Sequence, residues 1–246
     1  MTMTSREQVW NPYCGPAPTP AHWLAHWNWD PTLLATMFAL LVAGAYLSRP
    51  TIRSQVGAFV LVFAMFVTPL CALGSAMFIA RSIHHLVLAI ALAPVLVAAI
   101  GPHVFSRLPL GTATAVQAAT FWAWHVPAFY EGAMRSDLMF WTMQVTITAS
   151  AAAWWGALRR SGALEAGASL LAQMVQMGAL GALLVFAGRA LYAPHFYTTV
   201  RWGLSPLEDQ QIAGLVMWVV GGGLYLLLAS VKLWRALGPD PQPSAA

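Results

Sequence analysis

Long apolar runs separated by short polar stretches dominate the chain. Each run reaches about 17 residues or more, the length that a helix needs to cross the hydrocarbon core of a bilayer. The runs cover residues 31–48, 56–75, 83–101, 111–127, 138–158, 168–188 and 206–234. The pattern predicts an all-α polytopic membrane protein, a bundle of seven transmembrane helices within residues 31–235. Residues 1–30 form an outer tail and residues 236–246 a short cytoplasmic tail.

Local signals mark where some of these helices begin and bend. Asp30 and Pro31 suit the cap and first position of the first helix, and Ser205, Pro206 and Glu208 form a capping-box pattern before the last run. Proline at positions 69, 94 and 127 predicts kinks or ends, and Pro127 should end its helix just beyond His125.

Composition agrees with a membrane protein. Hydrophobic residues make up 59% of the chain and charged residues only 8%, against roughly 25% charged in soluble domains. The pI near 9.4 reflects few charges in total, so nucleic-acid binding is not expected.

No cleaved signal peptide is expected. Two cysteines, Cys14 and Cys71, are too few for a disulfide framework. A buried, apolar Cys71 is the favoured interpretation, although a thiolate would select Cu(I).

The distribution of Lys and Arg predicts the orientation. Seven spans would separate seven basic residues on one side from five on the other, and the richer side is cytoplasmic by the positive-inside rule. The cytoplasmic set is Arg49, Arg53, Arg107, Arg159, Arg160, Lys232 and Arg235, and the outer set is Arg6, Arg81, Arg135, Arg189 and Arg201. The N-terminus therefore faces outward. The same orientation places every histidine except His103 on the outer side.

Three histidines near the outer helix ends are candidate metal ligands. His84 and His85 are expected to open the third span, and His125 closes the fourth among aromatic residues. Neutral imidazole suits copper and zinc, and ionisable groups at membrane depth are commonly functional. Interfacial histidines bonded to backbone or water are the alternative for the His84–His85 pair. His22 and His26 fit better in an interfacial helix than in a metal site.

Asp209 lies about one turn inside the last span and calls for a partner. A lone carboxylate at that depth costs on the order of 2 to 3 kcal/mol. We expect an ion pair with an arginine on the same side, Arg189 or Arg81, with a metal site as the alternative. Gln210, Gly214, Met217 and Gly221 share a helix face. That face should let another helix approach closely and should turn Gln210 inward, and His195 lies in the loop just before this span.

No phosphate loop, GxSxG, HExxH or CxxC motif occurs in the sequence, so an enzyme is not expected.

Three segments carry a resemblance to a known family. In chain order they are "SIHHLVLAIALAPVLVA", "FWAWHVPAFY" and "LSPLEDQQIAGLVMW". Together they resemble the CtaG family of cytochrome c oxidase assembly factors of the seven-span membrane type. Arg81 stands where many members carry a first histidine, and Gln144 where many carry another.

The resemblance implies an assembly factor for a haem-copper cytochrome c oxidase in a bacterial cytoplasmic membrane. It implies action at the outer face, copper as cargo, and oxidase subunits or other assembly factors as partners beside membrane lipid. His84, His85 and His125 are the implied copper ligands, and Asp209, Gln210, Arg81, Arg189 and His195 are further functional positions. A membrane redox protein that binds haem or quinone, and a metal-free structural scaffold, are the alternatives.

Overall fold

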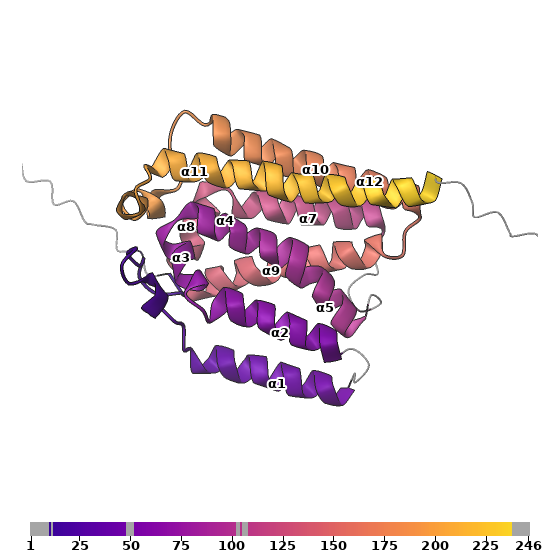
Figure 1. The fold of residues 1–246 in the computed structure, drawn as a ribbon, viewed down its shortest axis with the longest axis horizontal. Coiled ribbons are helices and arrows are strands. Elements are labelled where there is room, and N and C mark those ends of the chain that lie inside the picture. The colour runs from indigo at the N-terminus through magenta and orange to yellow at the C-terminus, as the bar shows by residue number, and fades with distance from the viewer. Residues whose placement is uncertain (1–9, 11, 48–51, 102–103, 105–107, 238–246) are drawn as a thin grey trace, which may run out of the picture.

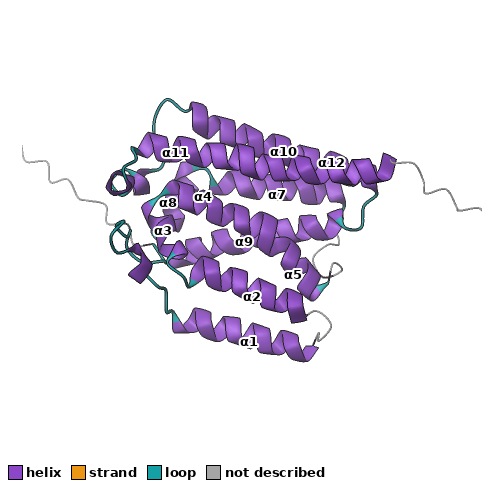
Figure 2. Ribbon diagram, in the orientation of Figure 1, coloured by secondary structure: helices purple, strands orange, loops and turns teal. Residues whose placement is uncertain are grey.

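The structure, a computed structural model, describes residues 10, 12–47, 52–101, 104 and 108–237. Helices make up 79% of it, and the described residues contain no strand (Figure 2). The all-helical class is therefore confirmed. The main helices are α1 (Pro31–Leu47), α2 (Ile52–Phe66), α3 (Leu70–Ala76), α4 (Phe78–Leu86), α5 (Ala93–Ile100), α7 (Leu110–Trp124), α8 (Pro127–Ala133), α9 (Asp137–Leu158), α10 (Ala163–Phe186), α11 (Pro206–Leu215) and α12 (Gly223–Leu237).

The long helices lie side by side as a bundle (Figure 1). Helix α1 packs on α2 at one edge, and the series continues through α5, α9, α7 and α10 to α12. The short helices α3 and α8 lie at one end of the bundle, where α1, α4 and α11 begin. The described N-terminal segment lies at this end, which we call the α11 end, and α12 finishes at the opposite end.

The expected spans are confirmed only in part. Four helical stretches are long and apolar enough to cross a membrane: Ile52–Ala76, Phe78–Ile100, Ala163–Phe186 and Pro206–Leu237. The apolar helix Pro31–Tyr46 is shorter. A count of seven spans and the orientation of the termini therefore stay predictions. Helix α7 ends at Trp124, and Pro127 occupies the first turn of α8, as the proline predicted.

The expected start of the third run was wrong. Helix α4 begins at Phe78 rather than at residue 83, so His84 and His85 lie in its last turn and are buried in the bundle. Arg81 belongs to the same helix. The apolar run expected from hydropathy began at residue 83 and had left it out. Hydropathy shortened the run because it penalises a buried cation, whereas tertiary packing accommodates one.

A proline explains the irregular middle of this stretch. Val87–Leu92 is π-helical and leads directly into α5, where Pro94 has no N–H to give to the preceding turn. The indole Nε1 of Trp155 donates to the carbonyl of Ala89 at 2.8 Å. In a membrane, a side chain from a neighbouring helix thus satisfies a backbone group within the irregular turn.

Glycines bring α10 close to the last helical stretch. A Cβ atom added at Gly181 would lie 2.7 Å from the carbonyl oxygen of Gly214, and one added at Gly214 would lie 2.6 Å from that of Gly181. No larger residue fits at this contact without moving backbone. The expected close-packing face, with Met217 fully buried, is confirmed.

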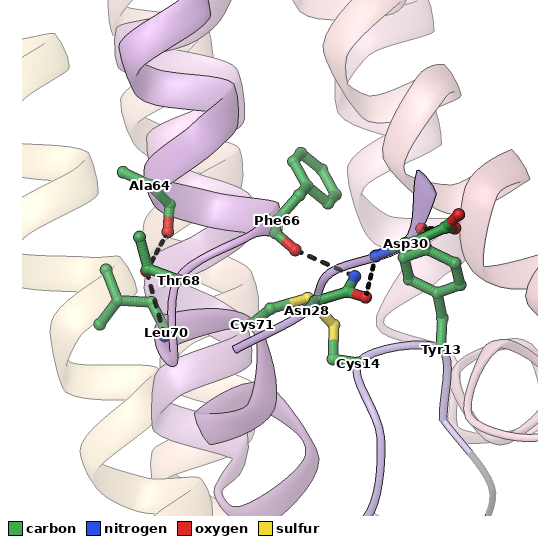
Figure 3. The surroundings of a disulfide bond; sticks show 9 residues. All are labelled: Tyr13, Cys14, Asn28, Asp30, Ala64, Phe66, Thr68, Leu70 and Cys71. Atoms are coloured by element: carbon green, nitrogen blue, oxygen red, sulfur yellow. Dashed lines mark hydrogen bonds between the residues drawn. A yellow bond between two sulfur atoms is a disulfide. The ribbon is translucent and has the colours of Figure 1, made fainter. Parts of the chain in front are cut away.

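A disulfide joins Cys14 to Cys71 (Figure 3). Cys71 is buried as expected, but the expectation that it is a free side chain was wrong. The bond ties the N-terminal segment to α3, across a separation of 57 residues. Asn28 strengthens the attachment, because its backbone N–H donates to Val67 O at 2.8 Å and its side chain to Phe66 O at 3.1 Å. The Tyr13 hydroxyl also donates to Asp30 at the start of α1. Spacing along the chain does not show that two cysteines 57 residues apart come within bonding distance.

We predict that Cys14→Ser lowers the unfolding temperature of the detergent-solubilised protein. Cross-linking a loop of this length typically contributes about 2 to 4 kcal/mol. Unfolding should be followed by tryptophan fluorescence. The disulfide itself should be verified by mass-tag alkylation, in which wild-type protein takes up two tags only after reduction. Two tags before reduction would contradict the pairing.

Candidate polar site at the α11 end of the bundle

A cluster of polar side chains lies buried where α4, α8, α11 and the loop after α10 meet. In an apolar bundle, buried polar groups must be satisfied by partners or must serve a function. The cluster consists of Arg81, His84, His85, His125, His195, Asp209 and Gln210, each at most 5% exposed. It contains most of the residues that the sequence singled out.

Asp209 caps a different helix from its own. Its carboxylate oxygens accept the backbone N–H groups of Phe78 at 2.7 Å and Ile79 at 3.0 Å, in the first turn of α4. These N–H groups have no partner within α4, and the positive end of the helix dipole favours a carboxylate there. The expected ion pair with Arg81 or Arg189 is therefore wrong, and Arg189 is exposed. Helix termini were the partners that sequence reasoning had not considered.

The two glutamines that follow Asp209 bind the other neighbouring helix end. Gln210 donates to Leu184 O at 3.1 Å and accepts the N–H of Leu191 at 2.7 Å. Gln211 donates to Val185 O at 3.1 Å. The carbonyls of Leu184 and Val185 belong to the last turn of α10 and lack partners within it. The inward orientation expected of Gln210 is confirmed.

We predict that Asp209→Asn destabilises the protein by about 1 to 3 kcal/mol, because an amide accepts one of the two N–H groups and leaves the other unsatisfied. The unfolding temperature in detergent measures the effect. Glu208→Gln is the matched control, since Glu208 is exposed and only closes the capping box with Ser205. Adding Arg189→Gln to Asp209→Asn should not recover any of the lost stability. A recovery would show that Asp209 and Arg189 form an ion pair after all.

An aromatic group holds His195 and His125 in place. The Tyr130 hydroxyl and His195 Nε2 share a hydrogen bond of 2.6 Å, and the Tyr192 hydroxyl donates to the His125 carbonyl at 2.8 Å. Phe78 stacks on Tyr192 with ring centroids 3.8 Å apart. Sequence analysis missed Tyr130 and Tyr192, because aromatic residues near helix ends also fit an interfacial belt.

His195 lies in the loop before α11 and is neutral. Burial, together with the charge of Arg81, lowers its pKa to about 3. An unfolded histidine titrates near pH 6.5, so unfolding below that pH takes up a proton and stability falls as the pH decreases. The contribution of His195 to the free energy of unfolding is fully present above pH 6.5.

We therefore predict that wild-type protein loses about 2 kcal/mol through His195 between pH 7.5 and pH 5. His195→Gln, which cannot titrate, should show a smaller decrease in unfolding temperature over the same interval. Tryptophan fluorescence at both pH values measures it. Parallel decreases in the two proteins would show that His195 does not contribute to acid sensitivity.

Three further histidine rings, those of His84, His85 and His125, lie next to one another in the cluster. The ring centroids of His84 and His85 are 6.3 Å apart, and those of His85 and His125 are 5.6 Å apart. His125 Nδ1 lies 2.7 Å from Phe121 O, which can only accept, so Nδ1 carries the proton and Nε2 has a lone pair. His125 Nε2 and both nitrogens of His84 and His85 have no partner among the described residues.

These donor atoms fit a metal ion held by two ligands. A metal about 2.0 Å from one nitrogen of each of two imidazoles places the ring centroids roughly 5 to 6.5 Å apart, a range that includes both His84 with His85 and His85 with His125. The hydrogen bond on His125 Nδ1 is of the kind that orients metal-binding histidines. Within the described part of the chain, no group of three His, Cys, Asp or Glu residues could hold a metal.

The other histidines lie apart from the cluster. His22 and His26 flank a single 3-10 turn, Trp23–Ala25, and His22 is exposed. They do not share a helix face as an i, i+4 pair would. His103 lies outside the described residues. The site is thus confined to the histidines of α4, of the α7–α8 junction and of the loop before α11.

Arg81 adds a positive charge that forms no ion pair with any carboxylate among the described residues. Its side chain is fully buried and lies close to the Tyr130 hydroxyl. The guanidinium lies over the ring of Phe140, 5.1 Å from its centroid. It also packs on Gly74, where an added Cβ would lie 2.8 Å from the guanidinium carbon.

Fold and site together define an all-helical membrane protein with a buried histidine-rich site at one end of its bundle. Residues 109–238, more than half of the chain, match the family model described as cytochrome c oxidase caa3 assembly factor (Caa3_CtaG). The chain belongs to this family, as the sequence resemblance predicted. The match includes His125, His195, Asp209 and Gln210, but not Arg81, His84 or His85. Neither a curated protein nor a solved structure matches the chain.

Proposed function

We propose that the protein promotes assembly of a haem-copper cytochrome c oxidase by holding copper at His85 and His125 on the outer face of a bacterial cytoplasmic membrane. The unpartnered nitrogens of these two neighbouring rings, whose centroids lie 5.6 Å apart, carry the proposal. Imidazole is a suitable copper ligand, and neutral ligands leave a cuprous ion free to move on to a client. The family supports a non-catalytic role in oxidase assembly.

His84 is the third candidate ligand. Its ring lies beside His85 rather than beside His125, and it packs edge-on against Phe66 at 4.9 Å. It also lines a cavity of about 220 Å³ together with Met65 and Met77. We assign it a secondary position, from which it could replace one ligand during transfer. Oxidase subunits or other assembly factors are the proposed receivers.

Two observations support action at the outer face. Disulfides persist in oxidising compartments outside the cytoplasm, and the Cys14–Cys71 bond lies at the α11 end of the bundle. Lys232 and Arg235 lie near the end of α12, at the opposite end, where the positive-inside rule favours the cytoplasm. The histidine cluster belongs to the α11 end, because α4 and α11 begin there.

We predict that His85→Ala or His125→Ala abolishes copper binding and lowers oxidase activity in membranes, while the abundance of this protein stays near that of the wild type. His22→Ala is the matched control, because His22 is exposed and remote from the cluster. Copper should be measured in purified protein loaded with Cu(I) under anaerobic conditions.

Other outcomes would favour other functions. A Soret band in the purified protein would indicate a membrane redox protein that binds haem. If the wild-type protein binds no copper and the His85→Ala or His125→Ala variant still lowers oxidase activity, the protein is a metal-free scaffold. Equal loss of abundance in all three variants would show a folding defect rather than a site.

A further inference from the structure

We infer that Arg81 sets the copper affinity of the histidine cluster, keeping it low enough for the ion to be released to a client. The inference rests on the proposed function and adds a residue to it. Its basis is a fixed, buried positive charge beside two candidate ligands, with no ion pair to a carboxylate in the described part of the chain.

Position on α4 brings Arg81 close to both histidines. His84 and His85 follow it at i+3 and i+4, the spacings that share one face of a helix. The charge of Arg81 acts on both of them and on His195. All these residues are at most 2% exposed, so solvent screens their interactions weakly.

No carboxylate forms an ion pair with Arg81 in the described part of the chain. The Asp209 carboxylate accepts the N–H groups of Phe78 and Ile79 in the first turn of α4 instead. Phe140 contributes a cation–π contact, which stabilises a guanidinium without supplying a counter-charge. The Tyr130 hydroxyl interacts electrostatically with Arg81 while it is hydrogen-bonded to His195. The fixed charge of Arg81 would therefore repel a cuprous ion at His85.

The sign of the effect follows from Coulomb's law. At an effective dielectric constant of about 20, two unit positive charges anywhere within about 12 Å of each other repel strongly enough to weaken binding tenfold or more. A protein that passes copper on gains from such weakening, because a tighter site would retain the ion. Arg81 is thus an affinity-determining residue rather than a ligand.

The test compares Arg81→Met with Arg81→Lys. Met removes the charge at similar length, and Lys keeps it. Purified proteins in detergent are titrated anaerobically with Cu(I) against a chromogenic cuprous chelator. We expect Arg81→Met to bind Cu(I) at least tenfold more tightly than wild type, and Arg81→Lys to bind like wild type. Adding His85→Ala to Arg81→Met should abolish the gain, which locates it at the cluster.

Two further measurements separate electrostatics from structure. Arg81→Met should unfold at a temperature no lower than that of wild type, because replacing a buried unpaired charge by an apolar side chain is not destabilising. In membranes, the same variant should lower oxidase copper content although its own copper content rises. Unchanged or weaker binding by folded Arg81→Met overturns the inference while the proposed function stands. If neither the wild type nor Arg81→Met binds copper, the proposed function is wrong and the inference fails with it.

Discussion

The contact between Asp209 and the first turn of α4 is the interaction on which the polar site depends. A helix that begins inside an apolar bundle leaves its first N–H groups without partners, and no water is at hand to satisfy them. Asp209 accepts two of them across 131 residues of sequence. By fixing where α4 starts, it fixes the positions of Arg81, His84 and His85. The site is therefore built around a helix terminus.

The segment from Ser205 to Gln211 extends the same principle to three helices. Ser205 and Glu208 cap α11 itself, Asp209 caps α4, and Gln210 and Gln211 bind the last carbonyls of α10. Glycine contacts between α10 and the last helical stretch hold these ends close enough for the bonds to form. A run of polar residues in an apolar chain thus acts as a junction between neighbouring helices.

The use of Asp209 as a cap has a consequence for charge. Asp209 binds the first turn of α4 and forms no ion pair with Arg81, which lies buried among histidines and aromatic rings. A metal ligand requires an unprotonated imidazole with a free lone pair. The buried charge of Arg81 opposes tight binding of a cation at such ligands. A site with accessible donors but restrained affinity suits a protein of an oxidase assembly family that receives an ion and releases it.

Sequence alone determined the class and most of the parts. Apolar runs predicted an all-helical membrane protein, Pro127 and the capping box predicted helix ends that the structure confirms, and the ordered motifs predicted the family. Sequence also selected His84, His85, His125, Asp209 and Gln210, because polar residues within apolar runs need a reason. These are local signals, which the spacing of residues along one helix carries.

Only the tertiary structure decided the partners. The Cys14–Cys71 disulfide, the bond from Asp209 to α4 and the pairing of Tyr130 with His195 join residues 57 to 131 positions apart. Hydropathy also placed the start of α4 too late, because it counts the cost of burying Arg81 but not the packing that permits it. Which groups meet at the end of a bundle depends on how helices pack against one another, and no periodicity within a single helix encodes that.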